Sequence, residues 1–142
     1  WHSADIRDLA QSTVDAYGAP GQFQLEGDSC RLDPRRALAL AMALHELGTN
    51  AAKYGALSSR EGRVCLHWSS TDRDGDPRIE VVWQEHGGPA VHEPAQRGFG
   101  SRLLERGLKH DLGGGVELAF APDGVRCHLW MPQPNLEEGQ LI

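Results

Sequence analysis

The sequence has few cysteines and no long apolar run, and each shortage excludes a class of protein. The three cysteines, Cys30, Cys65 and Cys127, are odd in number, lie far apart and form no CxxC pair. They therefore predict neither a disulfide framework nor a zinc site, and they fit a reducing compartment. The longest apolar stretch, 37–44, is too short to cross a bilayer, and the N-terminus "WHSADIRDLA" does not resemble a signal peptide. We expect a cytoplasmic location.

Positive charge is also scarce. The chain has 14 Lys and Arg against 20 Asp and Glu, a formal net charge of −6. Nucleic acids and anionic membranes both reward clustered Lys and Arg, so we expect neither as a partner. The seven histidines follow no metal-binding spacing. With 142 residues, 39% of them apolar, the chain can form one globular domain, expected over 1–132 with a disordered tail at 133–142.

The periodicity of the chain predicts a mixture of helices and strands. Helices are predicted at 3–17 (capped by Ser3 and stopped at Gly18), from Pro34 to Gly55, and at 99–112. Strands are predicted at 22–27, 63–70, 78–85, 116–120 and 125–131, the last four as two hairpins. The expected fold is an α/β (α+β) two-layer sandwich, with a mixed, mostly antiparallel sheet covered on one face by three helices.

Two stripes of side chains run along the predicted long helix. One is the apolar seam Leu40, Leu44, Leu47, Ala51 and Tyr54. The other is polar: Glu46, Asn50 and Lys53 are spaced i, i+4, i+7 and share a second face. This stripe could be a solvated helix surface. Alternatively, Asn50 could supply an oxygen to Mg²⁺, Glu46 could activate or position a reacting group, and Lys53 could meet phosphate charge.

Two glycine-rich segments follow the polar stripe along the chain. In "WQEHGGP" (83–89), a strand ends in Glu85 and breaks at Gly87-Gly88, so a flat ligand could approach the backbone and the carboxylate could accept from an amino group. In "RGFGSRLL" (97–104), Gly98 and Gly100 open a helix, whose free N–H groups favour an anion. Each signal is weak alone, but their order could assemble a pocket for adenine and phosphates.

The combination resembles the catalytic ATP-binding domain of sensor histidine kinases, of the Bergerat (GHKL) fold. More narrowly, it resembles the HWE group of these kinases, named for a histidine in the N box and a Trp-x-Glu in the first glycine box. Here His45 stands in "HELGTNAAKYGAL" and Trp83 and Glu85 stand in "WQEHGGP". The "GFGSRLL" segment is similar to the second glycine box of the same group, and the resemblance covers roughly residues 1 to 132.

The resemblance implies a role for each matching residue. Asn50 would coordinate Mg²⁺, and Glu46 and His45 would be catalytic, with Glu46 at the general-base position of the superfamily. Glu85 would receive the adenine amino group, where most relatives have Asp. The remaining ATP-binding residues would be Lys53, Tyr54, Gly87, Gly88, Arg97, Gly98, Phe99, Gly100 and Ser101, with 88–97 as a short lid.

The family also implies the reaction. The domain would bind ATP and Mg²⁺ and donate the γ-phosphoryl group to a histidine on a separate dimerisation hairpin, for relay to an Asp of a response regulator. Nothing in the chain resembles that hairpin. Two alternatives stay open: an anti-sigma-type serine kinase on the same fold, and a non-catalytic, nucleotide-dependent interaction module. Transfer of labelled phosphate to a supplied hairpin would separate the module from the kinase.

Overall fold

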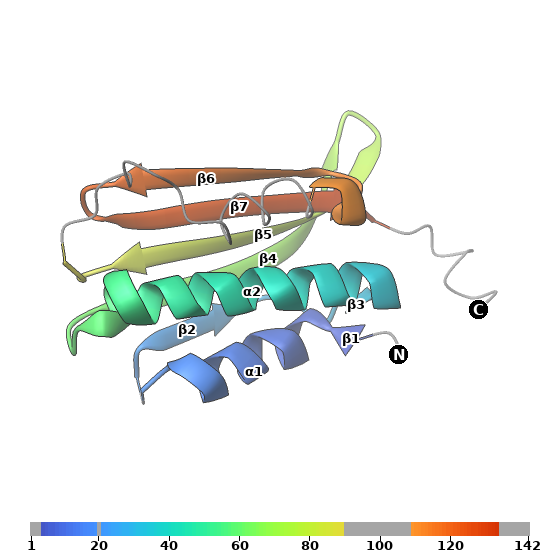
Figure 1. The fold of residues 1–142 in the computed structure, drawn as a ribbon. Coiled ribbons are helices and arrows are strands. Elements are labelled where there is room, and N and C mark those ends of the chain that lie inside the picture. The colour runs from blue at the N-terminus through green and yellow to red at the C-terminus, as the bar shows by residue number, and fades with distance from the viewer. Residues whose placement is uncertain (1–3, 20, 90–108, 134–142) are drawn as a thin grey trace.

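The computed structural model describes residues 4–19, 21–89 and 109–133. Its elements, in chain order, are β1 (Ala4–Asp5), α1 (Ile6–Tyr17), β2 (Phe23–Glu26), β3 (Arg31–Leu32), α2 (Pro34–Tyr54), the 3₁₀ turn η1 (Ala56–Ser58), β4 (Arg63–Arg73), β5 (Asp76–His86), β6 (Gly115–Ala121) and β7 (Gly124–Pro132). Helices α1 and α2 lie side by side across one face of the main sheet (Figure 1).

The main sheet has five strands in the order β2-β4-β5-β7-β6. The β2–β4 pair is parallel and the other three pairs are antiparallel. This confirms the expected α/β sandwich with a mixed, mostly antiparallel sheet. A second sheet, the short β1–β3 pair, was not predicted. Of the third predicted helix, 99–112, only residues 109–112 are described, and they are helical.

The core lies between the sheet and the helices. Alternate residues of β5 (Ile79, Val81, Trp83 and Glu85) are buried, as a strand with one face toward the helices requires. The predicted seam of α2 is confirmed for Leu40, Leu44, Leu47 and Ala51, all buried. It is wrong for Tyr54, which is 73% exposed. Tyr54 is the last residue of the helix, and just beyond it the Ala56 N–H donates to the buried Glu85 carboxylate.

The start of the first helix differs from the prediction. Residues 4–5 form β1, and α1 begins at Ile6 with Asp5 as its N-cap, whose side chain accepts a hydrogen bond from Arg7 N. The helix cannot begin earlier because the chain before it pairs with β3, and Ile6 N donates to the Cys30 carbonyl. The predicted stop at Gly18 is confirmed, since its N–H bonds to the Val14 carbonyl.

The first hairpin is longer than predicted. Strands β4 and β5 run to a two-residue turn, Asp74-Gly75, in which both residues have positive φ (54° and 80°). An Asp-Gly pair is a preferred sequence for such a turn, because Gly adopts positive φ without strain. The polar segment 71–77, expected as a loop, is therefore mostly strand. None of the described helices combines the length and apolar character that a membrane crossing requires.

Candidate functional site

The polar stripe of α2 forms as the helical spacing predicts. Glu46 and Asn50 are half-buried and adjacent, with Asn50 Nδ2 donating to Glu46 Oε1 over 3.4 Å. Lys53, one turn further on, is exposed and is the basic residue of the last helical turn. The stripe therefore offers one carboxylate, one carboxamide and one ammonium group along a single helix face.

The donor set fits a magnesium ion with few protein ligands. Because Asn50 donates through its nitrogen, its carboxamide oxygen is the atom left to face a cation. No three His, Cys, Asp or Glu side chains gather around a metal position anywhere in the ranges 4–19, 21–89 and 109–133. Mg²⁺ is commonly bound by one or two protein oxygens, with waters and ligand phosphates completing its shell. Asn50 thus offers one oxygen that could hold it, with Glu46 beside it.

Glu85 lies at the end of β5 and is only 2% exposed. Its Oε1 accepts from the backbone N–H of Ala56 at 2.9 Å, and its Oε2 accepts from the indole N–H of Trp83 at 3.0 Å. Burial raises the pKa of the Glu85 carboxyl, and the two hydrogen bonds, from Ala56 and then Trp83, oppose that rise because they favour the ionised form. The carboxylate therefore joins the C-terminal end of α2 to β5.

Glycines allow these two elements to meet. A Cβ on Gly55 would lie 2.3 Å from Glu85 Oε1, and one on Gly88 would lie 2.6 Å from the Ala56 Cα. Gly87 adopts φ +72°, and a Cβ there would lie 2.7 Å from the Glu61 carbonyl oxygen. The expected reason for the Gly87-Gly88 pair was approach to a ligand. The structure gives a second reason, since the chain's own backbone occupies that space.

His45 faces α1. Its Nδ1 is hydrogen-bonded to the Tyr17 hydroxyl, which also accepts from Thr49 Oγ1 at 3.2 Å. The Tyr17 ring packs on Gly48, where a Cβ would lie 2.5 Å from the ring. On a helix, His45 is turned by about 100° from Glu46, so His45 contacts α1 and not the polar stripe. Its expected catalytic role stays a prediction.

Several predicted site residues lie outside the described part of the chain. These are Arg97, Gly98, Phe99, Gly100 and Ser101, together with residues 90–97 of the expected lid. Tyr54 is described and is exposed beside Lys53 at the end of α2. Among the described residues, the candidate site therefore comprises the polar stripe of α2 and the Glu85 carboxylate, which contacts the backbone just after the same helix.

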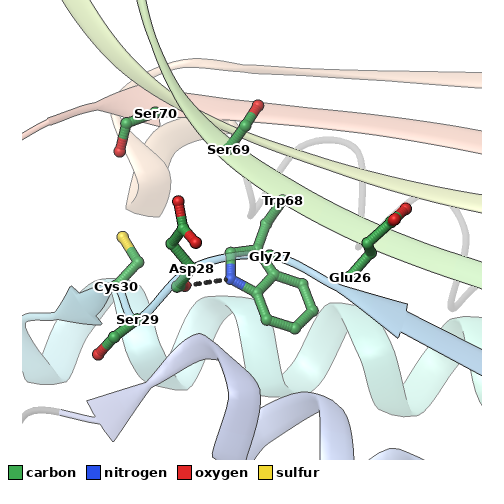
Figure 2. A pocket seen from close by; sticks show the side chains of 8 residues that line it. All are labelled: Glu26, Gly27, Asp28, Ser29, Cys30, Trp68, Ser69 and Ser70. Carbon is green, nitrogen blue, oxygen red and sulfur yellow. Dashed lines mark hydrogen bonds between the residues drawn. The ribbon is translucent and has the colours of Figure 1, made fainter.

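A cavity of about 370 Å³ lies elsewhere, between the loop after β2 and strand β4 (Figure 2). It is lined by Glu26, Gly27, Asp28, Ser29, Cys30, Trp68, Ser69 and Ser70. The Trp68 indole N–H donates to the Asp28 carbonyl oxygen at 2.8 Å and thereby fixes the loop (Figure 2). This cavity contains none of the residues predicted for the site.

Sequence reasoning missed three partners of the site. Ala56 contributes a backbone N–H, which no side-chain pattern reveals. Tyr17 had no predicted role in the site, whereas its hydroxyl is hydrogen-bonded to His45. Trp83 was noted as part of a motif without a role, although residues two apart on a strand share a face and the Trp-x-Glu spacing could have indicated the contact.

Comparison with known proteins places this geometry in context. No protein-family model matches the chain. It is 35% identical over 134 residues to a blue-light-activated histidine kinase of Brucella anthropi. That match covers 93% of this chain and 27% of the relative, so the chain spans about a quarter of the length of the relative.

Solved structures show the same fold. The histidine kinase domain of the blue-light-activated histidine kinase EL346 from Erythrobacter litoralis superposes with a TM-score of 0.64 at 19% identity, covering 90% of this chain and 59% of that one. The ATP-binding domain of PrrB from Mycobacterium tuberculosis superposes with a TM-score of 0.65 at 21% identity, covering 94% of this chain and 98% of that domain.

Proposed function

Because the chain is homologous to the histidine kinases and has the fold of their catalytic domains, we propose that it is the Mg-ATP-binding catalytic domain of a two-component sensor kinase. It donates the γ-phosphoryl group of ATP to a histidine on a separate dimerisation hairpin, for relay to an Asp of a response regulator. The observation that carries this proposal is the Glu46–Asn50 pair on α2, with the Glu85 carboxylate at the end of that helix.

Each of these residues has a distinct role in the proposal. Asn50 holds the magnesium ion through its carboxamide oxygen, and the ion supplies charge neutralisation at the phosphates. Glu46, hydrogen-bonded to Asn50, orients or deprotonates the accepting imidazole. Lys53 meets phosphate charge, and Glu85 accepts from the adenine amino group. Catalysis of phosphoryl transfer is mainly positioning and electrostatic stabilisation, which a rigid helix face can provide.

The proposal is tested by transfer of label. The 142-residue chain is mixed with γ-labelled ATP, Mg²⁺ and a purified dimerisation hairpin from a blue-light-activated histidine kinase. We expect acid-labile, base-stable phosphate on the hairpin and none on the chain alone. Nucleotide binding without any transfer would favour a nucleotide-dependent interaction module, and label on serine would favour an anti-sigma-type kinase.

Two variants separate the assigned roles. Asn50→Ala should abolish Mg²⁺-dependent nucleotide binding, because it removes the metal-facing oxygen. Glu46→Gln, which keeps the size of the side chain, should leave binding largely intact and impair transfer. Calorimetry with Mg-ATP gives the first quantity and labelled transfer gives the second. Equal losses of binding in both variants, or the reverse assignment, would contradict this division of roles.

A further inference from the structure

None of the roles assigned above accounts for the hydrogen bond between Trp83 and Glu85. Both residues lie on β5, two positions apart, with their side chains on the buried face of the sheet. Trp83 is 1% exposed and Glu85 is 2% exposed, so their hydrogen bond of 3.0 Å is shielded from water. A buried indole N–H needs a hydrogen-bond acceptor, and Trp83 uses the Glu85 carboxylate, whereas Trp68 uses a backbone carbonyl.

The two donors to Glu85 fix the carboxylate completely. The Ala56 N–H holds Oε1, and the Trp83 N–H holds Oε2. A Glu side chain has three rotatable bonds, and a contact to one oxygen still leaves the carboxylate free to rotate about it. The second contact removes that freedom. Each oxygen keeps one further lone pair, so the fixed carboxylate can still accept from a third donor.

We propose that Trp83 is a positioning residue for nucleobase recognition, which holds the Glu85 carboxylate in the orientation that accepts the amino group of adenine. The inference rests on the proposed function, because it concerns the same nucleotide site. This role would account for the hydrogen bond that the indole N–H of Trp83 donates. Without it, Glu85 would rotate about the Ala56 contact and would lose the fixed orientation that distinguishes an amino group from the carbonyl of guanine.

The surroundings of Glu85 make the effect of the Trp83 hydrogen bond on its ionisation measurable. Among the described residues, the neighbours that face it include Gly55 and Ala56 after α2, Val64 on the paired strand β4, and Gly124 at the start of β7, none of which is ionisable. The ionisable residue that follows it on β5, His86, is exposed, and so is Lys53 near the end of α2. The ionisation of Glu85 therefore responds mainly to burial and to its two donors.

The first measurement needs no nucleotide. Trp83→Phe keeps an aromatic ring and removes the N–H, so the pKa of Glu85, followed by NMR of ¹³C-labelled glutamate, should rise by about one pH unit. Trp68→Phe is the matched control. Trp68 is 3% exposed and its indole N–H also donates a hydrogen bond, to the Asp28 carbonyl. It lies four residues along β4 from the partner of Glu85, about 13 Å away, and should leave that pKa unchanged.

The second measurement is nucleotide selectivity. Trp83→Phe should reduce the ratio of ATP to GTP affinity about tenfold in competition binding, whereas Trp68→Phe should not change it. In a Glu85→Gln background, Trp83→Phe should have no further effect on the ratio, because Trp83 acts through the carboxylate. If Trp83→Phe folds poorly, benzothienylalanine at position 83 replaces the N–H by sulfur in a ring of the same shape and gives the same comparison.

The outcomes distinguish the two proposals. If the unmodified chain binds no Mg-ATP, the proposed function fails and this inference fails with it, whatever the Glu85 pKa does. If the chain binds Mg-ATP but Trp83→Phe leaves the Glu85 pKa and the ATP-to-GTP ratio unchanged, this inference alone is overturned. An equal change of the ratio in Trp83→Phe and Trp68→Phe would also overturn it, since general loosening of the core would then be the cause.

Discussion

At the scale of single residues, the identity of Glu85 is set by its two donors. A carboxylate presents acceptors in both directions, and here the Ala56 N–H and the Trp83 N–H each use one oxygen. A carboxamide cannot do this, because its NH₂ group would face one of those N–H groups. The residue is therefore expected to contribute to folding as well as to recognition of the base.

Glu85→Gln should lower the free energy of unfolding by about 1–3 kcal/mol, the cost of leaving a buried donor unpaired. The same change should erode the preference for ATP over GTP, which we expect to be at least about 2 kcal/mol in the unmodified chain. Urea denaturation and competition binding give the two quantities. Glu117→Gln, on an exposed residue of β6, is the matched control. GTP bound as tightly as ATP by the unmodified chain would exclude Glu85 as the adenine reader.

The raised pKa of Glu85 predicts how stability depends on pH. In the folded state the pKa of the Glu85 carboxyl lies above the value of 4.5 that it has in the unfolded chain, so folding favours the protonated form. Between that value and the raised folded pKa, the folded state binds more protons, so this residue's contribution to stability falls as the pH rises through the window. Denaturation series should show a shallower fall over that window for Glu85→Gln than for the unmodified chain. Parallel curves would contradict the assignment.

At the scale of elements, α2 carries the polar stripe of the candidate site and is fixed at both ends. Its C-terminal end is joined to β5 through Glu85. At its N-terminal end, the Asp33 carboxylate accepts from Arg36 N at 2.9 Å and from Arg36 Nη1 at 2.7 Å. Burial alone would raise the pKa of Asp33, but the hydrogen bonds from Arg36 outweigh it and the net pKa is lowered.

Asp33→Ala should therefore destabilise the fold by about 1 kcal/mol, a typical loss for an N-cap. Because the folded pKa is lowered, this contribution is present above the unfolded value of 3.8 and is lost as the pH falls through the folded pKa. Urea denaturation at neutral and acidic pH measures both effects. Asp72→Ala, at an exposed position of β4, should change little. A similar loss in both variants at neutral pH would argue against the cap.

The elements also show what the sequence could predict. Hydrophobic periodicity located α2, Gly18 and Asp33-Pro34 marked helix ends correctly, and alternation found both hairpins. The predicted start of α1 was wrong because residues 4–5 form a strand that pairs with residues 31–32, and the helix begins only after them. Such a pairing depends on segments distant in the chain, and no local pattern contains it.

The residues of the candidate site likewise divide into those that the sequence predicts and those that it does not. The Glu46, Asn50 and Lys53 stripe follows from helical spacing alone, so it could be read directly from the sequence. The partners of Glu85 depend on where the end of α2 meets the end of β5, and a backbone N–H such as that of Ala56 leaves no mark in the sequence. The Tyr17–His45 contact likewise depends on how α1 packs against α2.

At the scale of the whole molecule, the strand pairs of the sheet differ in how far apart their two strands lie in the sequence. Strands β4 and β5 form one hairpin, and β6 and β7 form another. Strand β2, in contrast, lies parallel to β4, with Phe23 opposite Val64, and the chain between them contains β3, α2 and η1. The polar stripe is thus carried on the connection that links the one parallel pair among the described strands.

That parallel pair has a consequence for the order of folding. Pairs of residues distant in the chain cost loop-closure entropy before they contribute stability, so β2 should join the sheet after the rate-limiting step. Leu25→Ala on β2 should then mainly speed unfolding, with a φ-value near zero, whereas Val81→Ala in the central strand should slow folding. Stopped-flow chevrons measure both, and a high φ-value at Leu25 would reverse this order. By the same order, the face of α2 that carries the candidate site would form before β2 joins the sheet, and β2 would be the first strand to leave when the domain opens.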